Sequence, residues 1–393
     1  MPATHDRDHS TASTPTLYLA FELGWTTWKL AFADAPARAP RQVTIPARDT
    51  DALRREIARA RRRLGLPDDA PVRSVFEAGR DGFWLHRYLI HHGHENLVVD
   101  PASIEVNRRA RRAKSDGLDV VKLLAMLQRH HGGERGLWAV VNVPAPEDED
   151  RRAPQRELMA LKAERTEHSN RIKGLLAHLG LAFVVDGRLP ERLAALRQWD
   201  GRPVPEHTAA RLLREFERWK LVDAQVRDRE NAQRRAVRDD AAPHVEQVRR
   251  LMDLKGVGPV GAWLLVQEIF GWRRIKNRRE LASLVGLVPT PYQSGSSHRE
   301  QGISKAGNRR VRWMLVELAW MWLQYQPRSA LSRWYHERFG SGNARARKVG
   351  IVALARKLLV AFWKYLEFGE APEGAEMVPW RKKLNGRLPA GTG

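Results

Sequence analysis

Apolar and polar positions alternate along the first part of the chain in a way that predicts both strands and helices. The expected strands cover residues 16–33 (as a hairpin turning near Gly24), 72–76 and 97–99, and the expected helices cover residues 51–64, 82–92 and 116–129. Strands that alternate with helices favour an α/β domain, which we place at residues 17–145.

The following segment, residues 146–250, is highly charged, and its apolar residues recur at helical spacing. They form two stripes: Leu158, Leu161, Ile172, Leu175, Leu176 and Leu179, then Leu212, Leu213, Phe216, Trp219, Val222 and Val226. Such stripes are typical of an antiparallel helical hairpin or a coiled coil. A rigid spacer or a dimer contact fits this segment better than chemistry does.

Residues 251–369 predict a compact, mostly helical C-terminal domain that is rich in tryptophan. Five tryptophans lie in apolar helical runs, so we expect most of them in the core: Trp313, Trp320, Trp322, Trp334 and Trp363. Residues 1–16 are a polar lead-in, which we expect to be disordered. Residues 370–393, with proline, glycine and cations, are expected to be a tail.

Composition narrows the classes of protein. Hydrophobic residues make up 42% of the 393 positions, enough for sizeable cores. The chain has no cysteine, which excludes disulfides, thiolate zinc sites and cysteine nucleophiles. We find no signal peptide and no apolar run of membrane-spanning length, so we expect a cytoplasmic protein without a membrane partner.

Charge is the strongest global signal. The chain has 68 Lys and Arg against 46 Asp and Glu, a net charge of +22. A protein this basic typically binds a polyanion, because phosphate contacts release condensed counterions. Arginine dominates, so a GC-rich genome explains part of the excess. Binding to a membrane surface is a weaker interpretation of this charge, because no basic amphipathic helix with an aromatic face stands out.

Four acidic residues of the first domain are candidate metal ligands. Glu22 lies in the apolar strand LAFEL, Glu77 ends the strand VRSVFE, and Asp116 and Asp119 open a helix on one side. Carboxylates that converge from strand ends and a helix would bind Mg²⁺, and two metals about 4 Å apart are the recurrent arrangement for phosphodiester chemistry. Taken singly, each acid also fits a cap, a helix-dipole position or an arginine pair.

Two further segments suggest contacts to phosphates. The run RRARRAK supplies Arg108, Arg109, Arg111, Arg112 and Lys114, although an exposed basic helix would look the same. In LKGVGPVGAWLL, residues 254–265, Gly256 and Gly258 separate two helical stretches in a helix–hairpin–helix-like pattern that would present backbone N–H groups to a phosphate. An ordinary glycine-rich connection fits that segment equally well.

The polar segment at residues 286–313 combines serines with cations. Ser294, Ser296, Ser297 and Ser304 are followed by Lys305, Arg309, Arg310 and Arg312. An exposed serine between cations is suited to attack on a phosphate, and it is also what a solvated turn looks like. The segment has no GxSxG elbow and no Ser–His–Asp order, so triad hydrolysis is not supported.

These motifs together resemble a known family over residues 17–366. The matching blocks are the first strand with Glu22, FEAGRDGFWLHRYL, VVDPASIEVNRRARRAKSDGLDVVKLLA, LKGVGPVGAWLLVQEIFGWRRIKNRRELASLVGLVPTPYQSG and GISKAGNRRVRWMLVELAW. The chain resembles insertion-sequence transposases that join a RuvC-like (RNase H-like) DEDD domain to a C-terminal serine transposase domain. Such proteins are DNA recombinases guided by a noncoding bridge RNA.

The resemblance implies roles for particular residues. Glu22, Glu77, Asp116 and Asp119 would bind Mg²⁺ or Mn²⁺, and Ser294, in the family's SG position, would form a phosphoserine link to DNA. The two domains would form a composite site across a homodimer or homotetramer assembled through the helical hairpin. Basic surfaces would hold the guide RNA and the double-stranded donor and target DNA at the bacterial nucleoid.

One position departs from the family pattern, which has aspartate where this chain has Glu22. Glutamate is one methylene longer but is still a hard oxygen ligand, so metal binding can survive with altered geometry. Ser296 and Ser297 lie close to Ser294, and only the family's SG position favours Ser294 among them.

Two other functions fit the same residues. A metal-dependent nuclease or junction resolvase would use the four acids with water as the nucleophile and form no covalent adduct. A non-catalytic nucleic-acid-binding protein would keep the acids for structure and bind without a divalent metal.

Overall fold

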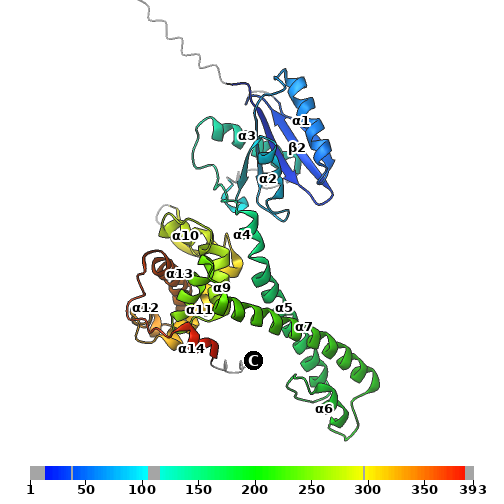
Figure 1. The fold of residues 1–393 in the computed structure, drawn as a ribbon, viewed down its shortest axis with the longest axis vertical. Coiled ribbons are helices and arrows are strands. Elements are labelled where there is room, and N and C mark those ends of the chain that lie inside the picture. The colour runs from blue at the N-terminus through cyan, green and yellow to red at the C-terminus, as the bar shows by residue number, and fades with distance from the viewer. Residues whose placement is uncertain (1–13, 37–38, 105–115, 295–296, 386–393) are drawn as a thin grey trace, which may run out of the picture. The chain divides into compact units, whose positions relative to one another are not determined.

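The computed structural model describes residues 14–36, 39–104, 116–294 and 297–385. The chain divides into two compact units, Met1–Val143 and Pro144–Gly393, which we call unit 1 and unit 2 (Figure 1). Unit 1 is built on a sheet with helices, and unit 2 is almost wholly helical. The protein is therefore of mixed α/β type, as the alternation of patterns predicted.

Unit 1 contains a five-stranded mixed sheet in the order β3-β2-β1-β4-β5. The strands are β1 Leu17–Leu23, β2 Thr27–Ala33, β3 Arg41–Pro46, β4 Val72–Glu77 and β5 Glu95–Val99. The first three pair antiparallel, whereas β1 pairs with β4 and β4 with β5 in parallel. The centre of the sheet is therefore β1, and its C-terminal end lies at the same edge as the end of β4.

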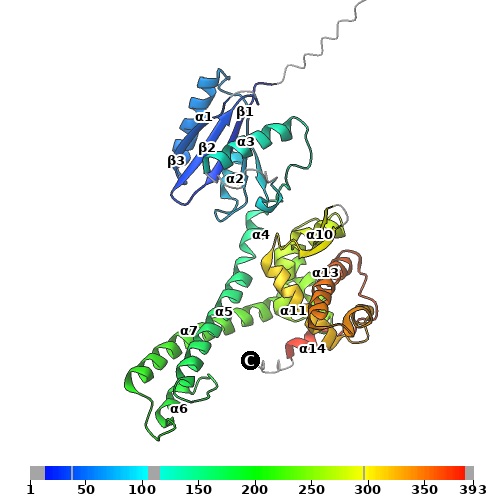
Figure 2. The same cartoon turned by 180° about the vertical axis from the view of Figure 1, so that it is seen from behind.

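Helices cover both faces of this sheet (Figures 1 and 2). Large side chains such as Phe21 and Phe32 pack on one face with α1 (Thr50–Leu64) and α2 (Trp84–His91). Small side chains such as Ala20 and Ala31 face α3 (Asp116–His131), whose leucines complete a second core. Successive side chains of a strand point to opposite faces, so alternate residues of β1 and β2 belong to the two different cores.

The sequence prediction missed one strand of this sheet. β3 is an edge strand in which Ile45 is the buried residue and the others are half-buried or exposed. An edge strand with one apolar anchor produces almost no alternation, so its pattern was not recognisable. The helices expected at residues 51–64, 82–92 and 116–129 are all present, to within two residues at each end.

Unit 2 begins with α4 (Pro146–Asp150) and an antiparallel pair of long helices, α5 (Ala153–Ala177) and α7 (Glu206–Asp239), as the two apolar stripes predicted. The short α6 (Leu189–Ala195) lies in their connection. Side-chain pairs run in opposite directions along the two helices: His168 with Glu215 at 2.7 Å, Arg165 with Asp223 at 2.9 Å, and Lys162 with Glu230 at 2.7 Å. Leu213 is the exception in its stripe, being 40% exposed.

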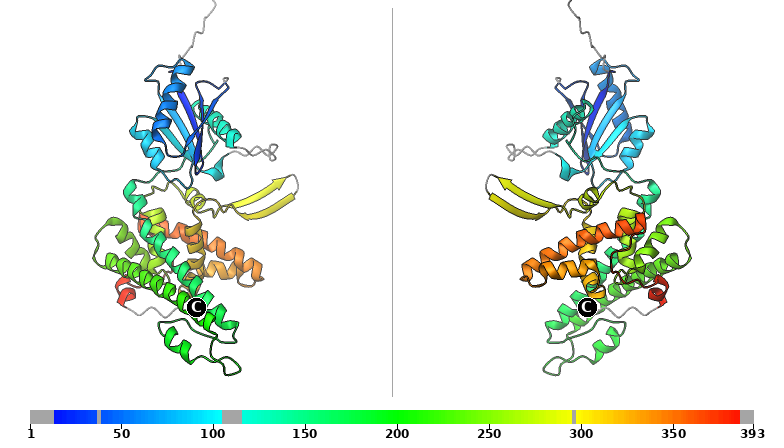
Figure 3. Two further views of the ribbon diagram at one scale, coloured as in Figure 1. Left: turned by 90° about the vertical axis from the view of Figure 1, so that its right-hand side faces the viewer. Right: turned by 90° about the vertical axis from the view of Figure 1, so that its left-hand side faces the viewer.

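The rest of unit 2 is a helical body with one two-stranded ribbon. Its elements are α8 Pro243–Asp253, α9 Pro259–Leu265, η3 Val266–Phe270, α10 Arg278–Leu284, β6 Pro289–Ser294, β7 Ser297–Ile303, α11 Arg309–Tyr325, α12 Ala330–Tyr335, η4 His336–Gly340, α13 Ala344–Phe368 and α14 Trp380–Asn385. Figure 3 shows the ribbon β6–β7 projecting from these helices. Among the described residues, no helix is long and apolar enough to cross a bilayer.

This region differs from the sequence prediction in two places, although three of the five tryptophans, Trp322, Trp334 and Trp363, do lie in or against the core. The segment at residues 286–313 has the composition of a solvated turn, but Pro289–Ser294 and Ser297–Ile303 within it form the antiparallel ribbon β6–β7. Its polar residues lack the apolar alternation that identifies a buried strand. Trp322 is 1% exposed and belongs to the core, yet Trp313 and Trp320 are 52% and 47% exposed, because they lie on the outward side of α11.

A buried carboxylate joins three segments of unit 2. Glu268, only 2% exposed, accepts hydrogen bonds from Arg156 of α5 at 2.6 and 2.9 Å and from Asn308 at 2.9 Å. Asn308 in turn caps the N-terminus of α11 through the amides of Arg310 and Val311. The carboxylate therefore fixes the start of α11 against the helical hairpin.

We expect Glu268→Gln to lower the free energy of unfolding of unit 2 by about 2 kcal/mol, the worth of a charged hydrogen bond to a half-exposed arginine. Burial alone would raise the pKa of Glu268, but the hydrogen bond and charge of Arg156 bring that pKa below its ordinary value of 4.5. The depressed pKa stabilises the fold above pH 4.5, and the contribution disappears as the pH falls through the folded-state pKa.

Urea unfolding at pH 7 and at acidic pH measures this effect. The matched control is Glu246→Gln in α8. It removes an exposed carboxylate paired with Arg249 of the same helix, and it should change the free energy of unfolding by less than ~0.5 kcal/mol. Equal effects of the two substitutions, or a difference that does not shrink on acidification, would contradict the role of Glu268.

Candidate active site in unit 1 and serine ribbon in unit 2

Two of the predicted metal ligands meet at one edge of the sheet. The parallel register pairs Phe21 of β1 with Phe76 of β4, so the next residues, Glu22 and Glu77, stand side by side at the strand ends. Both line a small pocket of about 230 Å³ together with the loop at residues 78–82. Neighbouring strands are about 4.8 Å apart, so the two carboxylates share one local environment.

The register also explains how these side chains point. Glu22 follows Phe21 and so belongs to the face that bears Ala20, and Glu77 is related in the same way to Val75. This is the face covered by α3. Lys29 of β2 lies opposite Glu22 in the antiparallel register, which gives the site a cationic neighbour on a third strand.

Helix α3 packs on this face of the sheet. The ring of His131, its last residue, lies 5.9 Å from the ring of Tyr18 near the start of β1. Glu22 is four residues, about 13 Å, further along the strand from Tyr18, and Asp119 is twelve residues, about 18 Å, back along the helix from His131. Asp119 is half-buried, and Asp116 is the first helical residue, its side chain lying outside the described part of the structure.

A third carboxylate lines the pocket and was not recognised in the sequence. Asp81, with 7% of its side chain exposed, lies in the loop after β4 and bonds Arg48 at 2.7 Å. Arg48 adopts a φ of 68°, an uncommon conformation for a residue other than glycine. Its guanidinium also lies 5.0 Å from the ring of Trp25, whose other cationic neighbour is Arg80 at 4.7 Å. A single acid in a short loop has no sequence pattern that would reveal it.

The described residues contain no group of three or more acidic or histidine side chains arranged to hold a metal ion. Glu22 and Glu77 line the pocket, Asp81 is bonded to Arg48, and Asp119 of α3 is not among the residues that line it. The basic run with Arg108, Arg109, Arg111, Arg112 and Lys114 lies outside the described residues. Its predicted contacts to phosphates therefore stay a prediction.

In unit 2 the predicted glycine turn joins α8 to α9. Gly256 has a φ of 89°, and a Cβ there would meet Tyr325 and the carbonyl of Met321, so glycine is required by conformation and by packing. Gly258 is the N-cap residue of α9. The ammonium of Lys383 donates to the carbonyls of Met252, Leu254 and Val257 around this turn. The connection is thus tied to α14, and its role in nucleic-acid binding stays a prediction.

The predicted nucleophile lies in the ribbon. Ser294 is the last residue of β6 and pairs with Ser297, the first residue of β7, while Ser296 lies outside the described residues. Ser294 therefore lies at the end of the ribbon opposite to its base, where Pro289 pairs with Ile303.

The base of the ribbon is held by close approaches of the backbone. Gly286 has a φ of 67°, and a Cβ there would overlap the backbone of Ala306; Gly307, with a φ of 78°, is equally close to the carbonyl of Leu284. The amide of Lys305 donates to the carbonyl of Gly286 at 3.1 Å. These contacts join the chain before the ribbon to the chain after it.

The cations that follow the ribbon differ in their surroundings. Lys305, Arg309 and Arg310 are exposed. Arg312 is half-buried and donates to the carbonyls of Val285 at 2.9 Å and Ala306 at 3.2 Å. Arg312 therefore stabilises the ribbon base, a structural contact that the sequence did not reveal.

Known transposases match much of this chain. Residues 248–336 match the family described as Transposase IS116/IS110/IS902 family. The chain is similar to a Sinorhizobium fredii protein named as transposase y4rJ, with 44% identity over 317 residues, 78% of this chain and 80% of the relative. It is also similar to the transposase for insertion sequence element IS1328 of Yersinia enterocolitica, with 23% identity over 79% of this chain and 88% of the relative.

A family 20 transposase of Pseudomonas aeruginosa is a further relative, 26% identical over 80% of this chain and 89% of its own length. The protein is thus an insertion-sequence transposase by class. The extent and identity of the match to y4rJ, with the matched region in unit 2, show that the chain belongs to the IS116/IS110/IS902 family of transposases.

We expect Gly286→Ala to destabilise unit 2 by about 3 kcal/mol or more, because the added Cβ forces the backbone at Ala306 to move. Gly302→Ala is the matched control: Gly302 also has a positive φ, 89°, but a Cβ there meets nothing within 4 Å. Gly302→Ala should lower the free energy of unfolding by about 1–2 kcal/mol, because alanine at a positive φ is strained even where its Cβ meets no neighbour. Denaturant unfolding of both variants tests the close approach, and equal losses would show that the ribbon base is not constrained.

Proposed function

We propose that the protein is a DNA recombinase that cuts and rejoins DNA through a covalent phosphoserine intermediate, assisted by an acidic metal site in unit 1. The observation that carries the proposal is the side-by-side position of Glu22 and Glu77 at parallel strand ends in a strongly basic chain of the transposase family. The transposase names of the relatives support DNA as the substrate.

The sheet order supports the RuvC-like arrangement that the family resemblance implies, with acids at the ends of two parallel strands and on a covering helix. Two glutamates in one small pocket are a hard oxygen donor set that suits Mg²⁺ or Mn²⁺. Glu22, Glu77, Asp119 and Asp116 are the residues that would hold the ion. When bound, a divalent ion supplies neutralisation of charge on a reacting phosphate.

The serine chemistry follows from the ribbon. The Oγ of Ser294 attacks a DNA phosphorus, an Oγ–P ester bond forms, and the P–O3′ bond breaks. The serine proton is released to solvent, and the departing 3′ oxygen takes up a proton from solvent. Arg309 and Arg310, exposed at the start of α11, hold the adjoining phosphates by charge. The ester conserves the energy of the broken bond, so a new 3′-hydroxyl can reverse the reaction on another strand.

The proposal includes the partners that the family resemblance implies. A noncoding guide RNA would select the donor and target DNA, and the net charge of +22 is suited to holding several polyanions at once. The long helices α5 and α7 would pair with a second copy to form a homodimer or homotetramer, so that acids and serine act together in composite sites. The protein would work at the bacterial nucleoid, in the cytoplasm.

Ser294→Ala should abolish strand exchange, by at least about a thousandfold, and should leave DNA affinity nearly unchanged, because only the attacking oxygen is lost. A labelled DNA substrate with a nick beside the cleavage site traps the protein–DNA ester for detection on a denaturing gel. Ser297→Ala, the partner position across the ribbon, is the matched control and should retain the adduct.

The same assay separates the rival functions. Cleavage without an adduct, unchanged by either serine substitution, would replace this mechanism with that of a nuclease using water. Glu22→Gln with Glu77→Gln should abolish DNA cleavage whether the protein is a serine recombinase or a nuclease. Glu95→Gln, which removes an exposed carboxylate on β5, should leave cleavage intact in either case. DNA binding without cleavage under any divalent ion would leave a non-catalytic binder.

A guide RNA is tested by expressing the chain with the DNA that natively flanks its reading frame and sequencing the RNA that remains bound after a high-salt wash. We expect one discrete short RNA encoded in the flank, because specific contacts survive salt while purely electrostatic ones weaken steeply. Heterogeneous RNA, or none, would remove RNA guidance from the proposal and leave the serine chemistry to stand on its own test.

A further inference from the structure

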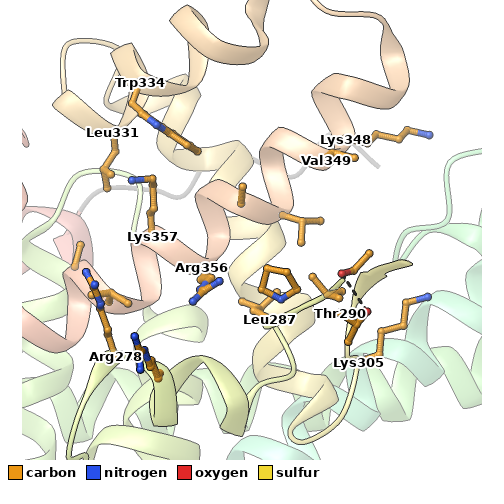
Figure 4. A pocket seen from close by; sticks show the side chains of 18 of the residues that line it. Arg278, Leu287, Thr290, Lys305, Leu331, Trp334, Lys348, Val349, Arg356 and Lys357 are labelled. Carbon is orange, nitrogen blue, oxygen red and sulfur yellow. Dashed lines mark hydrogen bonds between the residues drawn. The ribbon is translucent and has the colours of Figure 1, made fainter. Parts of the chain in front are cut away.

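Unit 2 contains a large groove along one side of α13, which we call the α13 groove. Its volume is about 1180 Å³, and it is bounded by α13, by α10, by α12 and by the residues at the base of the β6–β7 ribbon (Figure 4). The lining residues on α13 extend from Ala344 to Lys364, about 30 Å along the helix axis. The motifs that identify the family do not include this helix.

The charge of the α13 groove has one sign. Eight of its lining residues are lysine or arginine, and none is acidic. Five of the cations lie on α13 and three on the opposite wall, where Arg278 and Lys305 stand at the two ends of the view in Figure 4. Within the described residues, Lys364 has an ion pair, with Glu370 at 3.1 Å, and the other seven cations have none.

So many unneutralised cations in one concave site repel one another, and a bound polyanion relieves the repulsion. Some surface cations elsewhere in the protein have acidic partners. On α5 and α7, for instance, Arg165 and Arg227 both pair with Asp223. The absence of acids from the α13 groove is therefore a local feature of the site beyond the general excess of positive charge.

The floor of the α13 groove is apolar. The buried face of α13, with Leu354 and Leu358, packs into the core, yet a second face presents Val349, 54% exposed, and the half-buried Val352 and Val360. Trp334 of α12 adds an aromatic ring, over which the ammonium of Lys357 lies 4.4 Å from the centroid. The helix thus has apolar surface that the protein's own core does not cover.

Cations around an apolar floor suit a nucleic acid whose bases are unpaired. A duplex presents phosphates and sugars at its surface and keeps its bases stacked inside, so an apolar floor adds little to duplex binding. A single strand offers phosphates to the cations and flat base faces to aromatic and aliphatic side chains. An anionic bilayer requires protruding apolar side chains, whereas these lie at the bottom of a groove.

We propose that the α13 groove binds a single strand of nucleic acid, with its phosphates on the lysines and arginines and its bases against the floor formed by Val349, Val352 and Trp334. The inference rests on the proposed function, which makes DNA and RNA the polyanions that the protein binds. It adds that the α13 groove holds one of them as a single strand. Because Thr290 and Lys305 line one end, the strand would leave the groove at the base of the ribbon that carries Ser294.

The test measures binding of fluorescein-labelled single-stranded DNA, single-stranded RNA of the same sequence, and duplex DNA to the full chain over a series of salt concentrations. The groove variant is Arg345→Gln, Lys348→Gln, Lys357→Gln. It should weaken single-strand binding at least tenfold at moderate salt and reduce the slope of log affinity against log salt by about 2, since each lost phosphate contact removes ~0.7.

The matched control removes three exposed cations of α1, which have no ion pair among the described residues: Arg55→Gln, Arg62→Gln, Arg63→Gln. It makes the same change of net charge and should retain the affinity of the wild-type chain for a single strand. Equal losses in the two variants would overturn the proposal, because the effect would then come from total charge.

A second variant tests the floor. Val349→Gln with Val352→Gln should lower single-strand affinity several-fold, leave the salt slope unchanged and leave duplex affinity unaffected. An equal effect on single strand and duplex, or no effect on either, would overturn the contact with bases. A change in oligomeric state by sedimentation, without a change in single-strand affinity, would also overturn it by assigning the α13 groove to a second protein copy.

The DNA and RNA arms identify the source of the strand, a DNA segment opened during recombination or an unpaired part of a guide. Binding is measured without strand cleavage, so the Ser294 chemistry can fail while the α13 groove still binds, and the reverse. The two proposals therefore stand or fall separately.

Discussion

The parallel pairing of β1 with β4 is the constraint on which the candidate active site depends. Parallel strands end at the same edge of a sheet, and the register of Phe21 with Phe76 brings the carboxylates that follow into one pocket. A shift by one residue would turn Glu22 to the other face and into an apolar core. The buried phenylalanines that hold the register are therefore as necessary to the site as the acids themselves.

The carboxylates of Glu22 and Glu77 line one pocket and repel each other when both are charged, and the surrounding structure reduces that repulsion. Lys29 lies across from Glu22 in the antiparallel register, and α3 covers the same face of the sheet. The neighbouring Asp81 is compensated differently, by its bond to Arg48, so the pocket combines acids with distinct partners.

In unit 2, close backbone contacts and a buried carboxylate hold the polar β6–β7 ribbon on the helical body. Gly286 and Gly307 let backbone meet backbone at the ribbon base, and Glu268 fixes the first turn of α11 through Asn308. The ribbon itself needs no apolar core, because its base is held from both sides. A rigid support for the end of the ribbon, where Ser294 lies, suits a reaction on a large substrate.

Periodicity and residue type determined much of this protein before any coordinates. The alternation of strands and helices, the paired helices α5 and α7, and the proximity of Glu22 to Glu77 all follow from short-range patterns and from the rule that parallel strands end together. The edge strand β3, the polar ribbon, the pairing of Asp81 with Arg48 and the α13 groove did not follow. Each of these depends on residues distant in sequence, and a half-exposed valine on α13 has the same local pattern as a buried one. Only packing in three dimensions decides which face of such a helix is covered and which is left to a partner.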